Sequence, residues 1–285
     1  MANPSYQIWL AGDEYLLADY SQVNSIELGI KAVLLKNLIQ DENVTGVVDM
    51  IPSNTSLLIG YDNAVTDANK LKAEVLALMD EIEGRDNIVI PSRIIEFPVL
   101  FDDPWSKESV EAYCKNVKPI LNNIEKIIRD NNLSGLKQLI EYYTTPLFIV
   151  TYVGFWPGLA SFVCMDPHYF LSVEKYNPPR TSTPSGAIGI GGSNTSIYPM
   201  DTPGGFQLFG NIPTPIYHPE QKLPDFKETS VLCRTTDRFR FRSIDANEHA
   251  RIKAECDAGT YRYSIENAMF DLGEYKEFIK SIEVR

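Results

Sequence analysis

Hydrophobic residues in the first ninety positions alternate between two spacings, one typical of strands and one typical of helices. Short strand-like runs predict two strand pairs, Tyr6–Leu10 with Glu14–Asp19 and Gly46–Ile51 with Ser56–Tyr61. Apolar residues at steps of three and four predict amphipathic helices over Val23–Gln40 and Asp67–Gly84. This order of strands and helices predicts a small α+β domain over residues 1–92, ferredoxin-like in outline.

Beyond residue 92, two regions with regular hydrophobic periodicity lie on either side of residues 154–219, which differ in composition. Before that segment the pattern predicts strands over Ile94–Phe101 and Pro146–Val153, and helices over Lys107–Asp130 and Leu136–Tyr143. After it the pattern predicts strands near Ser230–Cys233, Phe239–Ile244 and Tyr261–Ile265, helices near Asn247–Asp257 and Gly273–Phe278, and a final strand.

Residues 154–219 hold 19 of the 35 glycine and proline residues of the chain. They carry only five charged residues, namely Asp166, Glu174, Lys175, Arg180 and Asp201. Such a density of helix breakers excludes a long helix, and the low charge does not fit a disordered linker. The segment therefore predicts a buried, turn-rich β structure, and its free backbone groups in a charge-poor setting are suited to binding a small polar ligand.

Composition narrows the classes of function. The 285 residues have a formal net charge of −12, which disfavours nucleic acid and anionic lipid as partners. No apolar run approaches the roughly 18 residues of a membrane helix, and the first residues lack the pattern of a secretory signal. Four widely spaced cysteines form no zinc or redox motif, so we expect free thiols and a cytoplasmic location.

Several common motifs do not fit this sequence. The glycines of Gly189–Gly192 are followed by turn and strand residues, whereas a phosphate-binding loop opens a helix. The three histidines, His168, His218 and His249, are not at the spacing of zinc ligands. The chain also lacks the G-x-S-x-G elbow of a serine hydrolase, so a structural or solvated role is expected for each histidine.

Two arginine patterns leave alternatives open. The alternating sequence Arg238-Phe239-Arg240-Phe241-Arg242 predicts a strand with its arginines on one face and both rings in the core. A solvated face explains it better than a nucleic-acid surface, given the acidic chain. Arg180 is the one arginine between residues 154 and 219, and it lies among neutral hydroxyl residues. It is suited either to binding a carboxylate or carbamate or to holding loop carbonyls.

A series of motifs resembles one known family. Gly154-Phe155-Trp156-Pro157-Gly158-Leu159-Ala160 is similar to G-F-x-P-G-F-A, and further matches follow in the family's order. They are Pro179-Arg180, Pro184-Ser185-Gly186, Gly189-Ile190-Gly191-Gly192, Ile197-Tyr198-Pro199, Thr202–Gly210 and the strand Asp237–Phe241. The chain therefore resembles the family of the 5-oxoprolinase B subunit, also known as allophanate hydrolase subunit 1 or KipI-like, which includes part of the urea carboxylase carboxyltransferase domain.

The resemblance implies a fold and a type of assembly. It implies that the α+β domain is followed, over residues 93–285, by a cyclophilin-like β-barrel with a helical connector and a C-terminal extension. It also implies a related barrel subunit as partner, similar to allophanate hydrolase subunit 2 or to the 5-oxoprolinase C subunit, together with a biotin carboxylase and biotin carrier in the carboxylase type. The complex would act on a small amide, urea or lactam by carboxyl transfer or ATP-dependent hydrolysis, with ATP or biotin supplied through partners and no cofactor or metal held by this chain alone.

The resemblance and the residue chemistry together assign the site. Arg180 is expected to bind a carboxylate-like group, and Tyr143 or Tyr198 to carry a proton, although free tyrosine titrates near 10. The expected substrate-binding residues are Gln207, Asn194 and Ser185, with backbone N–H groups of Gly191, Gly192, Gly204 and Gly205 stabilising an oxyanion.

This sequence also departs from the family pattern. Tyr143 stands where the family has histidine, and Ser185-Gly186-Ala187 replaces alanine-glycine-serine. These departures leave open a second hypothesis, a KipI-like inhibitor of a histidine kinase. A stand-alone prolyl isomerase is a weaker alternative, because a shared fold does not carry the activity.

Overall fold

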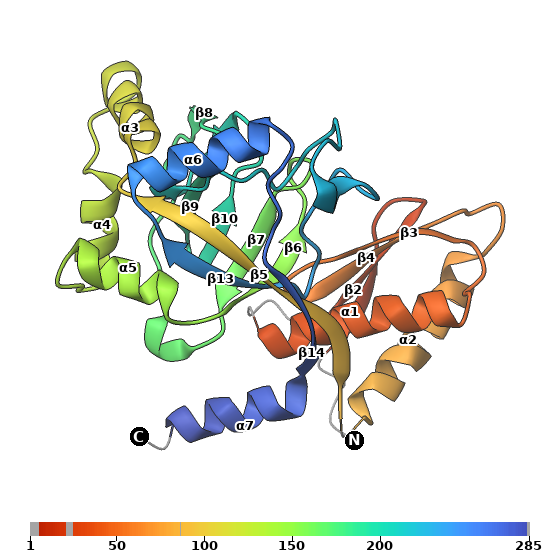
Figure 1. Ribbon diagram of the computed structural model, residues 1–285. Coiled ribbons are helices and arrows are strands. Elements are labelled where there is room, and N and C mark those ends of the chain that lie inside the picture. Colours follow the sequence, from red (N-terminus) through yellow and green to blue (C-terminus); the bar gives the residue numbers. More distant parts are fainter. Residues whose placement is uncertain (1–5, 21–24, 86, 284–285) are drawn as a thin grey trace. The chain divides into compact units, whose positions relative to one another are not determined.

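A computed structural model of the protein describes residues 6–20, 25–85 and 87–283 (Figure 1). The chain divides into two compact units, one of residues 1–92 with 268–285 and one of residues 93–267. The division differs from the predicted domains in residues 268–285, which were expected to extend the second domain. No helix in the described ranges is long and apolar enough to cross a membrane.

The described residues of the first unit form an antiparallel sheet with three helices. Its sheet has the order β1-β2-β4-β3. The elements are β1 (Gln7–Leu10), β2 (Tyr15–Asp19), α1 (Ile26–Asp41), β3 (Val47–Pro52), β4 (Ser56–Tyr61), α2 (Ala68–Glu83) and α7 (Leu272–Glu283). The α+β class is confirmed, but the chain order ββαββα is not the βαββαβ order of a ferredoxin-like unit.

Burial of one sheet face explains the alternation seen in these strands. Leu16 and Ala18 of β2 and Leu57 and Ile59 of β4 are buried, while residues between them are more exposed. Helix α1 contacts β3 and β4, and α2 contacts β1 and β2. The buried helix residues that complete this core include Ile30, Val33, Leu35, Ile39, Leu71, Val75, Leu78, Met79 and Ile82.

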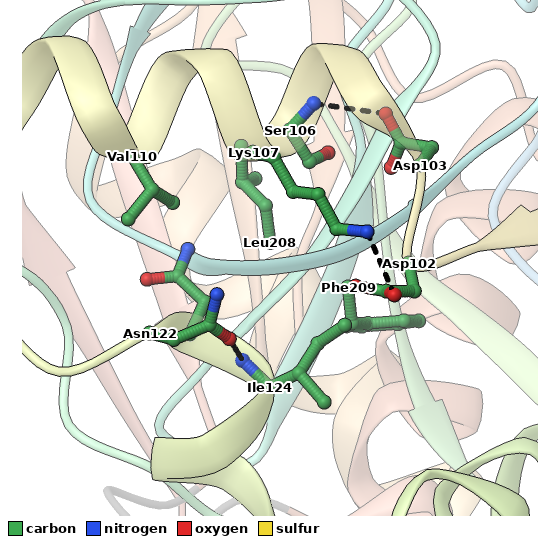
Figure 2. A pocket seen from close by; sticks show the side chains of 10 residues that line it. Asp102, Asp103, Ser106, Lys107, Val110, Asn122, Ile124, Leu208 and Phe209 are labelled. Carbon is green, nitrogen blue, oxygen red and sulfur yellow. Dashed lines mark hydrogen bonds and ion pairs between the residues drawn. The ribbon is translucent and has the colours of Figure 1, made fainter.

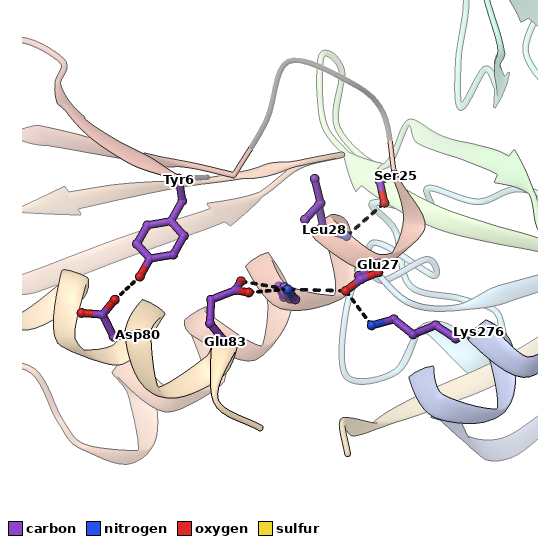
Figure 3. Close-up of polar contacts among 8 residues, drawn as sticks. Tyr6, Ser25, Glu27, Leu28, Asp80, Glu83 and Lys276 are labelled. Carbon is purple, nitrogen blue, oxygen red and sulfur yellow. Dashed lines mark hydrogen bonds and ion pairs between the residues drawn. The ribbon is translucent and has the colours of Figure 1, made fainter. Parts of the chain in front are cut away.

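Polar contacts join elements of the first unit that are distant in sequence (Figure 3). Lys31 Nζ lies 2.8 Å from Glu83 of α2 and 3.4 Å from Glu27, and Lys276 of α7 donates to Glu27 at 2.7 Å. The Tyr6 hydroxyl also donates to Asp80. Ion pairs of this partly exposed kind contribute little singly, but they link α1 with both α2 and α7.

The start of α2 gives a simple stability prediction. Asp67 is its N-cap, and its carboxylate accepts hydrogen bonds from Asn69 N and Lys70 N at 2.9 and 3.1 Å. Asp67→Ala should destabilise the first unit by about 1 kcal/mol, whereas Asp67→Asn, which keeps an accepting oxygen, should change stability by only a few tenths. Amide exchange in the first turn of α2 measures the effect; equal exchange in both variants would contradict it.

The second unit is built on an eight-stranded sheet with four helices around it. The strands are β5 (Val89–Phe101, beginning in the first unit), β6 (Phe148–Val153), β7 (Ala160–Cys164), β9 (Ala187–Gly191), β10 (Asn194–Ile197), β12 (Gln207–Asn211), β13 (Arg238–Ser243) and β14 (Ile265–Asp271, ending in the first unit). The helices are α3 (Pro104–Asn116), α4 (Asn123–Asp130), α5 (Leu136–Thr144) and α6 (Ala246–Asp257). A separate ribbon pairs β8 (Arg180–Thr183) with β11 (Thr202–Gly204), and short 3-10 turns cover Pro167–Tyr169 and Pro224–Phe226.

The strand pairings of this sheet close on themselves. The order is β12-β9-β10-β7-β6-β13-β5-β14, and β12 also pairs with β5 through Gly210 with Phe101 and Asn211 with Leu100. Seven strands therefore form a continuous ring of hydrogen bonds. Glycine is needed at position 210, where β12 meets β5, because an added Cβ would lie 2.9 Å from Val99. The cyclophilin-like detail of the expected barrel stays a prediction.

The ring encloses an aromatic core. The Phe239 ring contacts Phe97 edge-to-face, with centroids 4.8 Å apart, and Phe162 with centroids 5.1 Å apart. Phe239, Phe97 and Phe162 are each buried. Arg240 on the same strand is exposed, so the predicted separation of arginine and phenylalanine faces in β13 is confirmed.

Some predicted elements differ from those observed. The helix predicted over Lys107–Asp130 is two helices, because Pro119 disfavours helical geometry at Lys118 and α3 ends near Asn116. Around Val231 there is an isolated bridge to Tyr217 in place of a strand. The prediction of a final strand is wrong, because the described residues up to Glu283 form the helix α7. Residues 284–285, and residues 23–24 of the first predicted helix, lie outside the described residues.

Candidate functional site

A cleft of about 950 Å³ lies in the second unit, within the size range of small-molecule sites. The glycine- and proline-rich segment supplies most of its wall. The wall includes Pro184–Gly186, Ile197–Pro199, Asn211–Ile216, Pro104 and Trp105 at the start of α3, Ala246, His249, Ala250 and Lys253 on α6, and the charged residues Glu220, Lys222 and Asp257.

A hydrogen-bonded chain of buried polar groups crosses this cleft wall. Asn211 Nδ2 donates to the Ser185 carbonyl at 2.9 Å, so its Oδ1 faces His249 Nε2 at 3.0 Å. Nε2 therefore carries the hydrogen, and in the neutral ring Nδ1 is the acceptor. Burial, with a smaller effect of Lys253, lowers the pKa of His249, which favours this neutral form.

His249 was missed as a site residue by the sequence analysis. Its ring packs on Trp105 with centroids 4.8 Å apart, and both residues line the cleft. Nothing in the sequence links His249 with Asn211, because they come from different elements and meet only when α6 packs near the end of β12. No local spacing signal identifies such a pair.

Ser185 and Tyr198 are predicted site residues that do line the cleft. Ser185 is exposed, its Oγ donates to the Pro199 carbonyl at 3.2 Å, and its N–H donates to Asp201 at 2.9 Å. Tyr198 is 3% exposed, and burial raises the pKa of its hydroxyl while Arg180 opposes this shift. Tyr198 thus contacts both the cleft and Arg180.

Arg180 lies beneath the surface on β8, with 2% of its area exposed. Its Nη1 donates to the Phe206 carbonyl at 2.7 Å and its Nε to Thr183 Oγ1 at 3.3 Å. The guanidinium carbon lies 4.6 Å from the centre of the Tyr176 ring, in a cation–π contact. Arg180 therefore holds a loop carbonyl, which was one of the two roles open from the sequence.

The charge of Arg180 is not neutralised by a carboxylate within ion-pair distance among the described residues. Nη2 is buried without a hydrogen-bond partner, and burial lowers the pKa of the guanidinium while Tyr198 and Tyr176 oppose this shift. Arginine remains charged in proteins, so this part of the unit favours negative charge nearby.

Gly204 allows this cluster to pack. An added Cβ there would lie 2.5 Å from Tyr198 Oη and 2.8 Å from Thr183 Oγ1. Gly204 pairs with Arg180 in the β8–β11 ribbon, next to Gly205, whose carbonyl accepts from Tyr176 N–H at 2.6 Å. The structure thus brings Arg180, Tyr198, Gly204 and Gly205 together.

The remaining predicted substrate-binding residues lie elsewhere in the sheet. Gln207 Nε2 donates to the Glu174 carbonyl at 2.8 Å, and its buried Oε1 has no partner. Asn194 likewise has an unpartnered Oδ1. Gly192 N–H already donates to the Val173 carbonyl at 2.7 Å, and neither Gly191 nor Gly192 lines the cleft.

Tyr143 lies in the aromatic core. Its hydroxyl is 2.9 Å from Thr195 Oγ1, and its ring stacks on Phe148 with centroids 5.2 Å apart. Burial raises the pKa of its hydroxyl well above the ordinary value. This environment does not favour the predicted proton transfer by Tyr143, because the phenol gives up its proton less readily when the phenolate is desolvated.

Within the described ranges, no group of three or more histidine, cysteine, aspartate or glutamate side chains is placed to hold a metal ion.

Comparison with known proteins decides the family. The family description "Carboxyltransferase domain, subdomain C and D" matches residues 6–226. The chain belongs to this carboxyltransferase family. The resemblance seen in the motifs is therefore confirmed.

Relatives of this carboxyltransferase-domain protein differ greatly in length. Urea amidolyase of Lachancea kluyveri is 29% identical over 275 residues, covering 94% of this chain but 15% of the relative. The B subunit of 5-oxoprolinase from Bacillus subtilis is 26% identical over 265 residues, covering 88% of this chain and 98% of the relative. The chain thus spans a small part of the first protein and nearly the whole of the second.

A solved structure agrees with the sequence relatives. The crystal structure of the K. lactis urea amidolyase has a TM-score of 0.88 at 25% identity, covering 99% of this chain and 17% of that chain. The match extends past residue 226, so the C-terminal residues share the fold of the matching part of that structure as well.

Proposed function

We propose that this carboxyltransferase-domain chain is a non-autonomous part of an enzyme complex that acts on an amide, urea or lactam. The observation that carries the proposal is the coverage of nearly the whole chain by relatives that are urea amidolyases or B subunits of 5-oxoprolinase. Carboxyl transfer from biotin and ATP-dependent hydrolysis are the two forms of the reaction that these relatives' names leave open. The histidine-kinase inhibitor is not supported by these relatives.

The glycine cluster Gly189–Gly192 does not fit a nucleotide phosphate. Gly189–Gly191 lie within β9, and Gly192 turns into β10 rather than into a helix. Its N–H is already bonded to Val173. In this proposal ATP or biotin is supplied through partners, namely a related barrel subunit or a biotin carboxylase and carrier.

The cleft gives this chain a defined role in the proposed reaction. A substrate carbonyl or carboxylate in the cleft would accept a hydrogen bond from the Tyr198 hydroxyl, and the Arg180 charge beside it would offset part of the rise in pKa that burial causes. Neutral His249 would present an imidazole nitrogen to accept a proton. Ser185, which lines the same cleft, would orient the substrate. In this scheme Arg180 acts through Tyr198, and Gly204 acts by making room for Tyr198. Direct roles toward the substrate stay proposals for the predicted residues that do not line the cleft, namely Tyr143, Gln207, Asn194, Gly191, Gly192, Gly204 and Gly205.

Affinity purification from the native host, followed by mass spectrometry and a streptavidin blot, tests the assembly. A sister barrel subunit with a biotinylated protein supports carboxyl transfer. A sister subunit without biotin supports ATP-driven hydrolysis. Recovery of a histidine kinase with neither would overturn the enzyme proposal.

The role of Arg180 and Tyr198 predicts a kinetic result in the purified complex. Tyr198→Phe, which removes only the hydroxyl, should lower kcat/KM by about 100-fold, the loss seen when one donor to developing charge is deleted. Arg180→Met should cause a similar loss, while Arg240→Ala, at an exposed position on β13, should leave the rate unchanged. Full activity of Tyr198→Phe with an unchanged melting temperature would contradict the assignment.

A further inference from the structure

The sheet of the first unit carries an apolar row on the face turned away from its helices. Helices α1 and α2 cover the face on which alternate strand residues are buried. On the other face Trp9 pairs with Leu17, Leu17 with Leu58, and Leu58 with Ile51, so one side chain from each strand lies beside the next across the whole sheet. Trp9 is 54% exposed and Ile51 is 40% exposed. These four residues form the open-face row.

Two further apolar side chains extend the open-face row. Gly60 faces the same side as Leu58, and an added Cβ at Gly60 would lie 3.4 Å from Tyr15 Cε1 and 3.6 Å from Val48 Cγ2. Tyr15 and Val48 therefore lie over Gly60 on this face, and both are exposed. Single exposed apolar side chains are ordinary on a protein surface, whereas a contiguous set of six indicates a place where another molecule binds.

The charges of the strands and of the turns that join them all have one sign. Residues 6–20 and 47–66 contain five acidic residues and no lysine or arginine. The basic residues of the described part of the first unit lie on its helices or directly after α2, namely Lys31, Lys36, Lys70, Lys72, Arg85, Lys276 and Lys280. The sheet is thus acidic where the helices are mixed in charge.

Two of the acidic residues lie on the open face, one on each side of the row. Asp19 is two residues beyond Leu17 on β2, where it pairs with Ser56. Asp49 pairs with Gly60, and its Cβ would lie 3.7 Å from a Cβ added there. An apolar row with a carboxylate on either side is complementary to an apolar stripe that has a cation on either side.

Several acidic side chains outside this sheet have a basic partner within the chain. Figure 2 shows Asp102 paired with Lys107 at 2.8 Å, and Figure 3 shows Glu83 paired with Lys31, also at 2.8 Å. Asp49 accepts the N–H of the next residue at 2.8 Å, and no described lysine, arginine or histidine lies within ion-pair distance of it. A basic partner molecule would supply the opposite charge.

We propose that the open face of this sheet binds a basic amphipathic helix of a partner polypeptide, lying along the open-face row. Neighbouring strands are about 4.8 Å apart, so the row is about 15 Å long. About three turns of helix have this length. The apolar stripe of the helix would contact the row, and lysine or arginine side chains beside the stripe would approach Asp19 and Asp49.

Charge separates this partner from other molecules that could cover an apolar face. Two copies of the sheet, packed face to face, would bring their acidic residues together, and an anionic lipid surface would be repelled in the same way. The proposal does not depend on which reaction the complex performs, because the open face belongs to the first unit and the cleft to the second.

Photo-crosslinking of the full chain in its native host tests the proposal. The photoreactive amino acid benzoylphenylalanine replaces Trp9, and a matched control carries it in place of Ala77, an exposed residue of α2. Mass spectrometry should identify, from position 9 alone, a segment of another polypeptide with apolar residues at steps of three and four and lysine or arginine on both sides. A crosslink to a second copy, to lipid or to a segment without basic residues would overturn the proposal, and so would no crosslink from position 9 in a chain with an unchanged melting temperature.

Charge reversal tests the basic character of the partner separately. Asp49→Lys should lower the yield of the position 9 crosslink by about fivefold, because an attraction at the edge of the interface becomes a repulsion. Glu74→Lys, at a partly exposed position of α2, makes the same change of net charge and should leave the yield unchanged. Equal yields from the two variants would refute the choice of a basic helix.

Discussion

Replacing Phe239 with alanine should lower the free energy of unfolding of residues 93–267 by about 3–5 kcal/mol. Phe239 has no exposed area and lies inside the ring of strands. Its ring packs edge-to-face on Phe97 and Phe162, at 4.8 and 5.1 Å between centroids. The three rings come from three different strands, so the neighbours cannot both move to fill the space that the substitution leaves.

Urea unfolding followed by near-UV circular dichroism measures this loss. Arg240→Ala is the matched control, since it is the next residue of the same strand and faces outward. The control should change stability by no more than about 0.5 kcal/mol. Equal effects of the two substitutions would contradict the assignment of the core to the phenylalanine face of β13.

Replacing Asp237 with alanine should destabilise the same unit by roughly 3 kcal/mol, as expected when one partner of a buried ion pair is removed. Arg93 Nε donates to Asp237 Oδ1 at 2.9 Å and Nη2 to Oδ2 at 2.5 Å. The carboxylate also accepts the Arg234 N–H at 2.7 Å, and Arg93 donates to the Leu232 carbonyl at 2.7 Å. The substitution therefore leaves a partly buried guanidinium and a backbone N–H without their partner.

A double-mutant cycle isolates the pair from its surroundings. Arg93→Met combined with Asp237→Leu should lose less stability than the sum of the single variants, because no uncompensated charge remains. Thermal or urea unfolding of the four proteins gives the interaction energy. Additive losses would show that the two side chains act independently.

Much of the fold follows from short-range patterns in the sequence. Alternation in Arg238–Arg242 predicted the buried and exposed faces of β13, and Asp67 marked the start of α2. Pattern alone did not place residues 268–285, because Lys276 of α7 meets Glu27 of α1 at the far end of the chain. Contacts of that kind depend on tertiary packing, which leaves no local periodicity.

The candidate site was predicted in part for the same reason. Ser185 and Tyr198 were found from the glycine- and proline-rich segment, and both line the cleft. Arg180 was singled out by its isolation among neutral residues, yet only the structure shows that it lies behind Tyr198 rather than in the cleft. His249 was assigned no site role, because its hydrogen bond to Asn211 joins two elements that the sequence does not relate.

The ring of strands has a consequence for synthesis of the protein. Strand β5 pairs with β13 through Ile94 with Arg238, and with β12 through Phe101 with Gly210. During translation β5 therefore emerges long before any of its neighbours exists. Its pairing with β12 waits until the chain has grown past Asn211, its pairing with β13 until Ser243, and its pairing with β14 until Asp271. Such late, non-local pairing slows folding and exposes strand edges to aggregation. Nascent chains that end before β13 should accordingly need protection by chaperones, which the completed ring does not.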